Sequence, residues 1–539
     1  MTKSDGEIGE SDDSFDHSTK KYTNRVDWST YAPPLWLFTL VLGATILLRH
    51  IMDPMQSRFE TEDPGRTMVM AEWMLSDPFR SCKQPEISDE LWPGGFSPLY
   101  CAVYWGGISL VEPIYLPFMI IFGNNKFTLR ILAASLTTLT AYIYGRMAQS
   151  AWGSEWGYLL ATIYLLIPLM AFYGWHYQQF LTMMILLPIW VMQVTRGLEG
   201  KSWKGAYLVL ILASIDSPFF SIAVMLIAST LVLISSKGRW EPRWKHAVAF
   251  VLIAIAVNLT DLFVTHIAYG GRRSTLQSAS RRRTTWSLVS SELFWSQTFL
   301  HFSQFGWMLP LGIGGGIVAI VFSRKRTWLF DIEFLTQPKG RLLLTISASG
   351  SIGIMTMIFF AQAVTGVSYF LIPFVSVFAV ATVWLLHCIS NKSIQAGLIC
   401  LVLLAGVLSV DSTYEREGDL RKFTPVWNTW MEENITQTDV VMIDYSMTVF
   451  DATIIHSMDG AELRIMESNL DQEIMLRHID QHPEVTVVIL PYNGVESKGT
   501  LRQGLDERGW ERHSVAQYIG GYHTWIFFTS PDRTDTNQH

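Results

Sequence analysis

Long apolar runs alternate with short polar segments through most of the chain, from residue 31 to residue 410. A helix needs about 20 apolar residues to cross the roughly 30 Å hydrocarbon core of a bilayer. The runs predict about eleven membrane-spanning helices, near residues 33–50, 127–147, 156–172, 178–195, 205–216, 218–235, 246–267, 303–323, 342–363, 368–388 and 394–410. The two runs around 205–235 are short, and Asp216, Ser217 and Pro218 between them predict a tight hairpin.

The two ends of the chain lack this pattern. Residues 1–30 are acidic and Ser-rich and contain no apolar run, so we expect a disordered cytoplasmic tail and no cleaved signal peptide. After residue 411, apolar runs of strand length alternate with amphipathic segments, which predicts a small α/β domain with a mainly parallel sheet. Its predicted strands cover 440–444, 463–467, 486–490 and 525–529, and its predicted helices cover 471–482 and 498–508.

The composition supports a membrane-embedded chain. Of the 539 residues, 49% are hydrophobic and only 16% are charged, whereas a soluble domain carries about a quarter charged residues. The expected fold class is mainly α: a transmembrane helical bundle of residues 31–410, between the tail of residues 1–30 and a C-terminal extramembrane domain of residues 411–539. The net charge of −7 averages these unlike regions and therefore says little about partners. No nucleic-acid partner is expected for a membrane-embedded chain of this kind.

Basic residues predict the orientation of the chain. They gather in three of the short loops and mark these loops as cytoplasmic by the positive-inside rule. The residues are Arg196, Lys201, Lys204, Lys237, Arg239, Arg243, Lys245, Arg324, Lys325, Arg326, Lys339 and Arg341. With eleven spans, the N-terminus is then cytoplasmic. The C-terminal domain and two long loops, 51–126 and 268–300, face the outside.

The first outer loop is rich in acids and holds the main catalytic candidate. Asp63 precedes Pro64 at the start of a predicted surface helix over residues 66–75. It can act there as a helix N-cap or as a general base at the membrane surface. Glu62 beside it could raise the pKa of Asp63 by repulsion or share a divalent metal with it.

A series of short motifs carries a resemblance to a known superfamily. Asp63 leads a segment that contains Ala71, Met74 and Leu75. Later motifs are Trp92-Pro93, Pro98-Leu99-Tyr100, Phe122-Gly123, Leu129-Arg130-Ile131, Tyr144-Gly145-Arg146 and Tyr369-Phe370-Leu371-Ile372-Pro373. In order and spacing they resemble the GT-C membrane glycosyltransferases, in the branch of the protein O-mannosyltransferases and bacterial aminoarabinose transferases. The resemblance covers about residues 35–410.

The resemblance implies an inverting glycosyltransferase that uses a polyprenyl-phosphate sugar as donor. The acceptor would be a hydroxyl of a glycan, lipid or protein on the outer side of the membrane. The first-loop acid, Asp63, would deprotonate this hydroxyl. No cofactor is required by this reaction class, and a divalent metal remains open.

The chain departs from the family pattern where cations would meet the lipid phosphate. Asp216 stands where the family often has Lys, and Ser368 stands before Tyr369 in place of the usual Arg. Another source of positive charge lies in the second outer loop, against the positive-inside rule, at Arg272, Arg273, Arg281, Arg282 and Arg283. Arginine binds phosphate oxygens in a bidentate manner, so these residues are candidates for the donor phosphate or for anionic headgroups.

Further polar residues are candidates for substrate binding, each with an ordinary structural alternative. His176 can instead be an interfacial hydrogen-bonding residue, and Asp89 and Glu90 can be ordinary solvated acids of the loop. Asp216 can be either a turn residue or a second acid of the site. Tyr369 begins a span in the family pattern. Two other functions stay open: a transporter, which would show charged residues within spans and internal repeats, and a degenerate family member that binds or assembles without catalysis.

Overall fold

The computed structural model describes residues 33–49, 67–68, 71, 110–175, 179–217, 219–235, 243–268, 292–322, 332–359, 371–421, 430–431, 433–436, 438–444, 461–466, 471–491, 499–518 and 522–533. The predicted tail of residues 1–30 lies outside these ranges.

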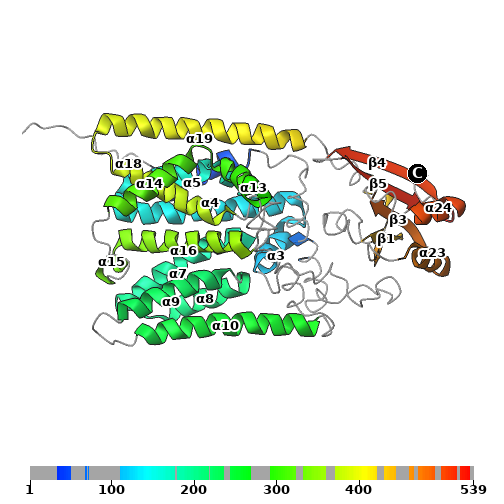
Figure 1. Cartoon of the computed structure of the whole chain (residues 1–539), viewed down its shortest axis with the longest axis horizontal. Helices are drawn as coiled ribbons and strands as arrows, with labels where there is room; N and C mark the ends of the chain where they lie inside the picture. The colour runs from blue at the N-terminus through cyan, green and yellow to red at the C-terminus, as the bar shows by residue number, and fades with distance from the viewer. Residues whose placement is uncertain are drawn as a thin grey trace, which may run out of the picture. The chain divides into compact units, whose positions relative to one another are not determined.

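A bundle of helices occupies the described chain up to residue 421. Its helices are α1 (Leu35–Leu47), α3 (Val111–Phe122), α4 (Lys126–Trp152), α5 (Ser154–Leu166), α6 (Pro168–Tyr173), α7 (Gln179–Leu198), α8 (Lys204–Asp216), α9 (Phe220–Ser235), α10 (Arg243–Ala268), α13 (Glu292–Phe302), α14 (Met308–Phe322), α15 (Ile332–Thr336), α16 (Pro338–Phe359), α18 (Pro373–His387) and α19 (Lys392–Arg421). Helices α4, α5, α7, α16 and α18 pack on one another and run side by side (Figure 1).

The predicted spans coincide with helices, with two breaks, while α3, α13 and α15 lie in segments that were predicted as loops. In the span predicted at 303–323, residues Ser303–Phe305 form a short 3₁₀ helix before α14 begins at Met308. Among the described residues, four helices are long and apolar enough to cross a membrane by themselves: Lys126–Trp152, Phe180–Leu198, Pro338–Ile358 and Lys392–Ser412. The chain is therefore an integral membrane protein of helical type, while the number of eleven spans stays a prediction. The run at 156–172 is divided because Pro168 begins α6 and Ile167 before it is extended, with ψ 120°, as steric clash with proline requires.

Small residues allow helices to approach closely in the bundle. A Cβ added to Gly157 would lie 2.8 Å from the carbonyl oxygen of Gly145, so α4 and α5 touch backbone to backbone there. Such contacts are typical of membrane helices. Helix α19 exposes Leu401, Leu404 and Leu408, as a lipid-facing surface would.

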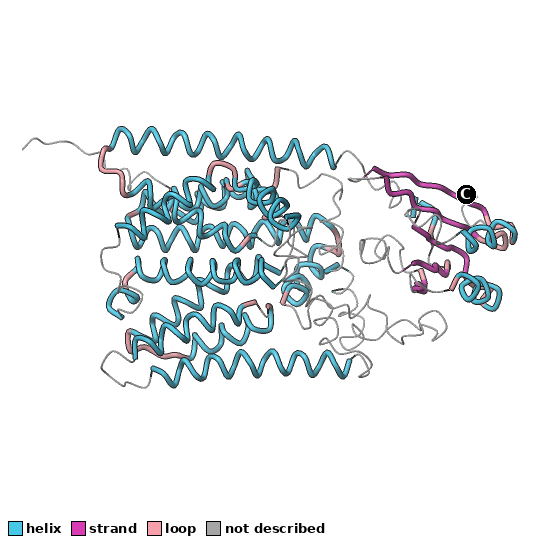
Figure 2. Tube along the Cα trace, viewed as in Figure 1, coloured by secondary structure: helices cyan, strands magenta, loops and turns pink. Residues whose placement is uncertain are grey.

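The described C-terminal strands form one five-stranded sheet. The strands are β1 (Val440–Asp444), β2 (Glu462–Met466), β3 (Val485–Pro491), β4 (Glu511–Tyr518) and β5 (Tyr522–Thr529), and Figure 2 draws them in magenta. Their order in the sheet is β2-β1-β3-β5-β4. Helices α23 (Gln472–Gln481) and α24 (Gly499–Glu507) pack on the face formed by Met442, Val488 and Phe528.

The sheet differs from the prediction in one strand and in its pairing. The predicted strands and helices are present within a few residues of their predicted bounds, except that β4 was not predicted, because its polar sequence shows little apolar alternation. β1 pairs in parallel with β2 and β3, but β5 pairs antiparallel with β3 and β4. The sheet is therefore mixed, not mainly parallel, because β4 and β5 are joined by a short connection that only antiparallel strands allow. The predicted domain boundary at residue 411 falls inside α19, and a separate outer domain of residues 411–539 stays a prediction.

Candidate active site

Most of the predicted site residues lie outside the described part of the chain. These are Asp63, Glu62, Asp89, Glu90, His176, Tyr369, Arg272, Arg273, Arg281, Arg282 and Arg283. The exception is Asp216, and the segment just after Asp63 is described at Thr67, Met68 and Ala71. Asp216 and this segment therefore anchor the described part of the site.

Asp216 is a deeply buried acid. It is the last residue of α8 and is only 3% exposed. The Thr182 side chain of α7 and the backbone N–H of Leu110 lie close to it, and Glu112 is near enough to act on it electrostatically. Neither carboxylate oxygen makes a hydrogen bond of normal geometry with a described residue. Such a buried acid is costly, so this burial is unlike that of an ordinary surface turn residue.

A buried arginine lies near the beginning of α4. Arg130 is 4% exposed, and its guanidinium carbon lies 4.7 Å from the centre of the Trp175 ring, a cation–π geometry. The turn that carries Trp175 is held to α4, since the Thr137 hydroxyl donates a 2.7 Å hydrogen bond to the carbonyl of Gly174. Arg130 belongs to one of the sequence motifs, but the motif by itself predicts no role for it. A basic residue inside an apolar helix is the signal that could have singled it out.

The first-loop segment is attached to the junction of α3 and α4. Met68 and Ala71 are buried in the core of the bundle. The side-chain amide of Asn124 donates a 3.1 Å hydrogen bond to the carbonyl of Met68, and its oxygen accepts a 3.0 Å hydrogen bond from the hydroxyl of Tyr115. The segment that directly follows Asp63 in sequence is thus anchored to the bundle.

The opposite end of the bundle carries a different set of groups. Trp152 ends α4 and stacks with His387 of α18 at 5.7 Å. It lies 22 residues beyond Arg130, or about 33 Å along a helix. Arg341 of α16 forms an ion pair with Glu199, which also pairs with Lys201. Residues from the basic loops predicted to be cytoplasmic therefore gather at the end away from Arg130.

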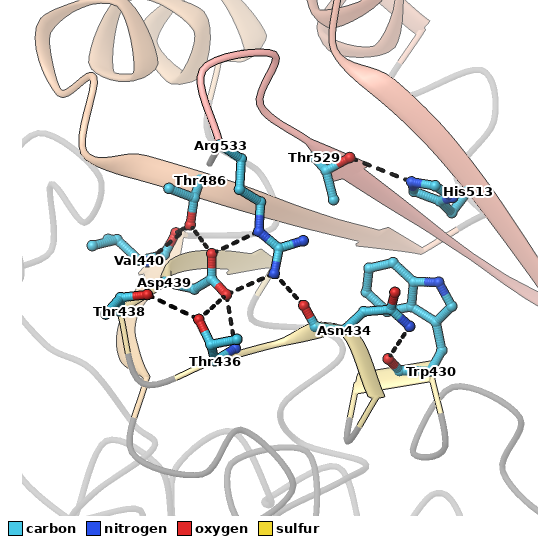
Figure 3. A network of polar contacts seen from close by, with 10 residues as sticks. All are labelled: Trp430, Asn434, Thr436, Thr438, Asp439, Val440, Thr486, His513, Thr529 and Arg533. Atoms are coloured by element: carbon cyan, nitrogen blue, oxygen red, sulfur yellow. Dashed lines mark hydrogen bonds and ion pairs between the residues drawn. The ribbon is translucent and has the colours of Figure 1, made fainter. Parts of the chain in front are cut away.

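A polar network in the C-terminal sheet is structural in character. Arg533 donates from Nε and Nη2 to the two carboxylate oxygens of Asp439, at 2.9 and 2.7 Å, and Thr486 donates to the same carboxylate at 2.7 Å (Figure 3). Burial alone would raise the pKa of Asp439. The hydrogen bonds from Arg533, the Thr436 amide and Thr486, together with the charge of Arg533, outweigh burial and lower that pKa. All of these groups are engaged with one another, so the network connects strands.

Among the described residues, no group of three or more His, Cys, Asp or Glu side chains could hold a metal ion. The metal prediction concerned Glu62 and Asp63, which lie outside those residues.

Comparison with known proteins identifies the fold. No protein-family model matches the sequence, and no curated protein matches it. The structure of ArnT from Cupriavidus metallidurans bound to undecaprenyl phosphate is similar over 93% of this chain and 98% of that chain, with a TM-score of 0.50 and 11% sequence identity. The Archaeoglobus fulgidus oligosaccharyltransferase tethered with an acceptor peptide is similar over 93% of this chain and 74% of that chain, with a TM-score of 0.54 and 10% identity.

Both structures have the GT-C fold, and the bundle described here has it as well. The resemblance seen in the sequence motifs is confirmed at this level. At 10–11% identity the similarity concerns the fold.

Proposed function

We propose that this chain is a membrane glycosyltransferase that transfers a sugar from a polyprenyl-phosphate donor to an acceptor hydroxyl at the outer face of the membrane. The observation that carries the proposal is the anchoring of the segment after Asp63 to the α3–α4 junction of a GT-C bundle. ArnT, of the same fold, was solved with undecaprenyl phosphate bound, which supports a lipid-linked donor.

In the proposed reaction, Asp63 accepts the proton of the acceptor hydroxyl while the hydroxyl oxygen attacks the anomeric carbon. The bond between that carbon and the phosphate oxygen breaks, and the polyprenyl phosphate leaves with the electron pair. Direct displacement inverts the configuration at the anomeric carbon. Cationic side chains stabilise the charge that develops on the leaving phosphate.

Roles for the other residues follow from their chemistry. The arginines at 272, 273, 281, 282 and 283 would bind the donor phosphate, and Glu62 would adjust the pKa of Asp63. Asp216 would bind substrate as a second acid, which its burial at the end of α8 supports. We assign contacts with the acceptor or the sugar to Asp89, Glu90, His176 and Tyr369.

Substitution of Asp63 by Asn tests the function. Asn keeps the size of the side chain and caps a helix about as well as Asp, but it cannot accept the proton. Loss of a general base costs about 10²–10⁴ in rate. We expect Asp63→Asn to lose sugar transfer from a polyprenyl-phosphate donor while its melting temperature stays unchanged.

Asp77→Asn, in the same loop, is the matched control and should keep transfer. Near-normal turnover of Asp63→Asn would show that Asp63 is structural. If the wild-type protein binds the donor but transfers no sugar from it, the chain is a binding or assembly subunit.

A further inference from the structure

The turn between α3 and α4 has three residues with separate tasks. Gly123 has φ 86°, in the left-handed region that favours glycine. Asn125 caps α4, since its side-chain oxygen accepts a 2.9 Å hydrogen bond from the backbone N–H of Thr128. Asn124 takes part in neither task and instead reaches a distant part of the chain, the first outer loop.

The contacts of Asn124 fix how its amide group is oriented. The Met68 carbonyl can only accept a hydrogen bond, so the NH₂ group must face it. The amide oxygen then faces the hydroxyl of Tyr115, a fully buried side chain of α3. Tyr115, Asn124 and Met68 thus form a chain of hydrogen bonds that we call the tether. It joins residues 56 positions apart in sequence.

The tether acts on a segment whose position matters for the proposed reaction. Met68 follows Asp63 by five residues, which span at most about 18 Å. Burial of Met68 and Ala71 fixes the side of the segment that faces the bundle. The tether adds a directional bond, which apolar packing alone does not supply, and so sets the register of the backbone.

We propose that Asn124 is a positioning residue, which fixes the first-loop segment at Met68 and thereby places Asp63 for transfer. The positioning of Asp63 rests on the proposed function; the fixing of the segment does not. An ordinary turn residue at position 124 would stabilise α3 and α4 without affecting the first loop. The two roles therefore predict different responses to substitution.

The test compares Asn124→Asp with Asn125→Ala in the full-length protein. Asp at position 124 can still accept from Tyr115, but it cannot donate to the Met68 carbonyl. We expect the rate of amide hydrogen exchange at residues 67–71 to rise about fivefold, because one hydrogen bond that holds the segment is lost. We also expect kcat to fall by up to about 100-fold, since misplacement by 1 Å can cost that much, with the KM for the donor little changed.

Asn125→Ala should show the reverse pattern, with a lower melting temperature from the lost cap and unchanged exchange at residues 67–71. Tyr115→Phe removes the bond that orients Asn124 and a longer 3.5 Å contact with the carbonyl of Asn125, but it leaves the bond from Asn124 to Met68 in place. It should therefore give a smaller change of the same kind as Asn124→Asp.

Unchanged exchange at residues 67–71 in Asn124→Asp would overturn the tether. Faster exchange with normal kcat, in a protein whose transfer is abolished by Asp63→Asn, would overturn the positioning role. If the wild-type protein has no transfer activity, the proposed function and the positioning of Asp63 fail together. The exchange result then decides by itself whether Asn124 fixes the segment.

Discussion

Buried charged side chains of this chain are compensated in different ways. Arg130 lies against the face of an aromatic ring, and Asp216 lies near polar groups without a normal hydrogen bond to a described residue. Asp439, which is 3% exposed, has a bidentate arginine and further donors. Since breaking a buried pair leaves an uncompensated charge, Asp439 offers the clearest test of stability.

We expect Arg533→Met to destabilise the C-terminal sheet strongly. The substitution leaves the Asp439 carboxylate buried without its cation, which costs roughly 3–5 kcal/mol. Hydrogen exchange of β1 and β3 in the full-length protein measures the effect. Arg512→Met, at an exposed position of β4, is the control and should change the free energy of unfolding little. Equal effects of the two substitutions would contradict a structural role for the pair.

The same pair predicts a dependence on pH. The folded-state pKa of Asp439 lies below its ordinary value, which is about 3.9 in an unfolded chain. Its stabilisation is therefore fully present above that pH and is lost as the pH falls through the folded-state pKa. Asp439→Asn cannot ionise, so its stability should fall less than that of the wild type between pH 5 and pH 3.

At the residue scale, the sequence could predict chemistry but not contacts. An acid between two apolar runs singled out Asp216, and the structure buries it. The partners of Arg130 and Asn124 could not be predicted, because Trp175 and Met68 lie 45 and 56 positions away from them. Such pairs depend on how helices pack, which the local pattern does not contain.

At the element scale, the glycine run of α14 offers a matched pair of neighbouring positions. A Cβ on Gly315 would lie 2.1 Å from the carbonyl oxygen of Ala381 in α18, whereas a Cβ on Gly316 meets nothing within 4 Å. The contact with Gly315 is with backbone, so a helix must shift to make room. The close packing of α14 on α18 therefore requires the absence of a side chain at Gly315 but not at Gly316.

We expect Gly315→Ala to destabilise the protein by about 1–3 kcal/mol, as overpacking does. Gly316→Ala should be neutral or stabilising by up to about 1 kcal/mol, because alanine favours helix more than glycine does. Thermal unfolding of the two purified variants in the same detergent separates these effects. A Gly315→Ala variant as stable as the wild type would mean that α14 and α18 are farther apart.

Helices and strands were predicted correctly where the sequence pattern is strong, and they were missed where pairing with a neighbouring element determines the secondary structure. The apolar runs predicted most helices of the bundle because lipid and protein core both require apolar side chains, but α3 and α13 lie in segments that were predicted as outer loops. β4 was missed because its pairing with β5, not its composition, makes it a strand. The break between α5 and α6 follows from Pro168. This proline is visible in the sequence, but it lies within a continuous apolar run, which was predicted as one helix.

At the scale of the whole molecule, the two ends of the bundle differ in chemistry. One end holds Arg130, Asp216 and the tethered first-loop segment. The other holds Lys201, Arg341 and the aromatic cluster at His387. The positive-inside rule assigns the second end to the cytoplasm, and the proposed reaction then takes place at the outer face.

Cysteine labelling of the full-length protein tests this orientation. The four native cysteines, Cys82, Cys101, Cys388 and Cys400, are first replaced by serine. Single cysteines are then introduced at Lys201, in the loop after α7, and at Glu507, at the end of α24; both side chains are exposed.

A membrane-impermeant maleimide should label Glu507→Cys in intact cells, and it should label Lys201→Cys only after the membrane is opened. The reason is the cost of moving a loop that carries Arg196, Lys201 and Lys204 across the membrane. A permeant maleimide, which should label both variants in intact cells, controls for reactivity. The reverse pattern would place the Arg130 end in the cytoplasm, where an outer-leaflet donor could not reach it. The proposed reaction at the outer face would then be wrong, even though the GT-C fold would stand.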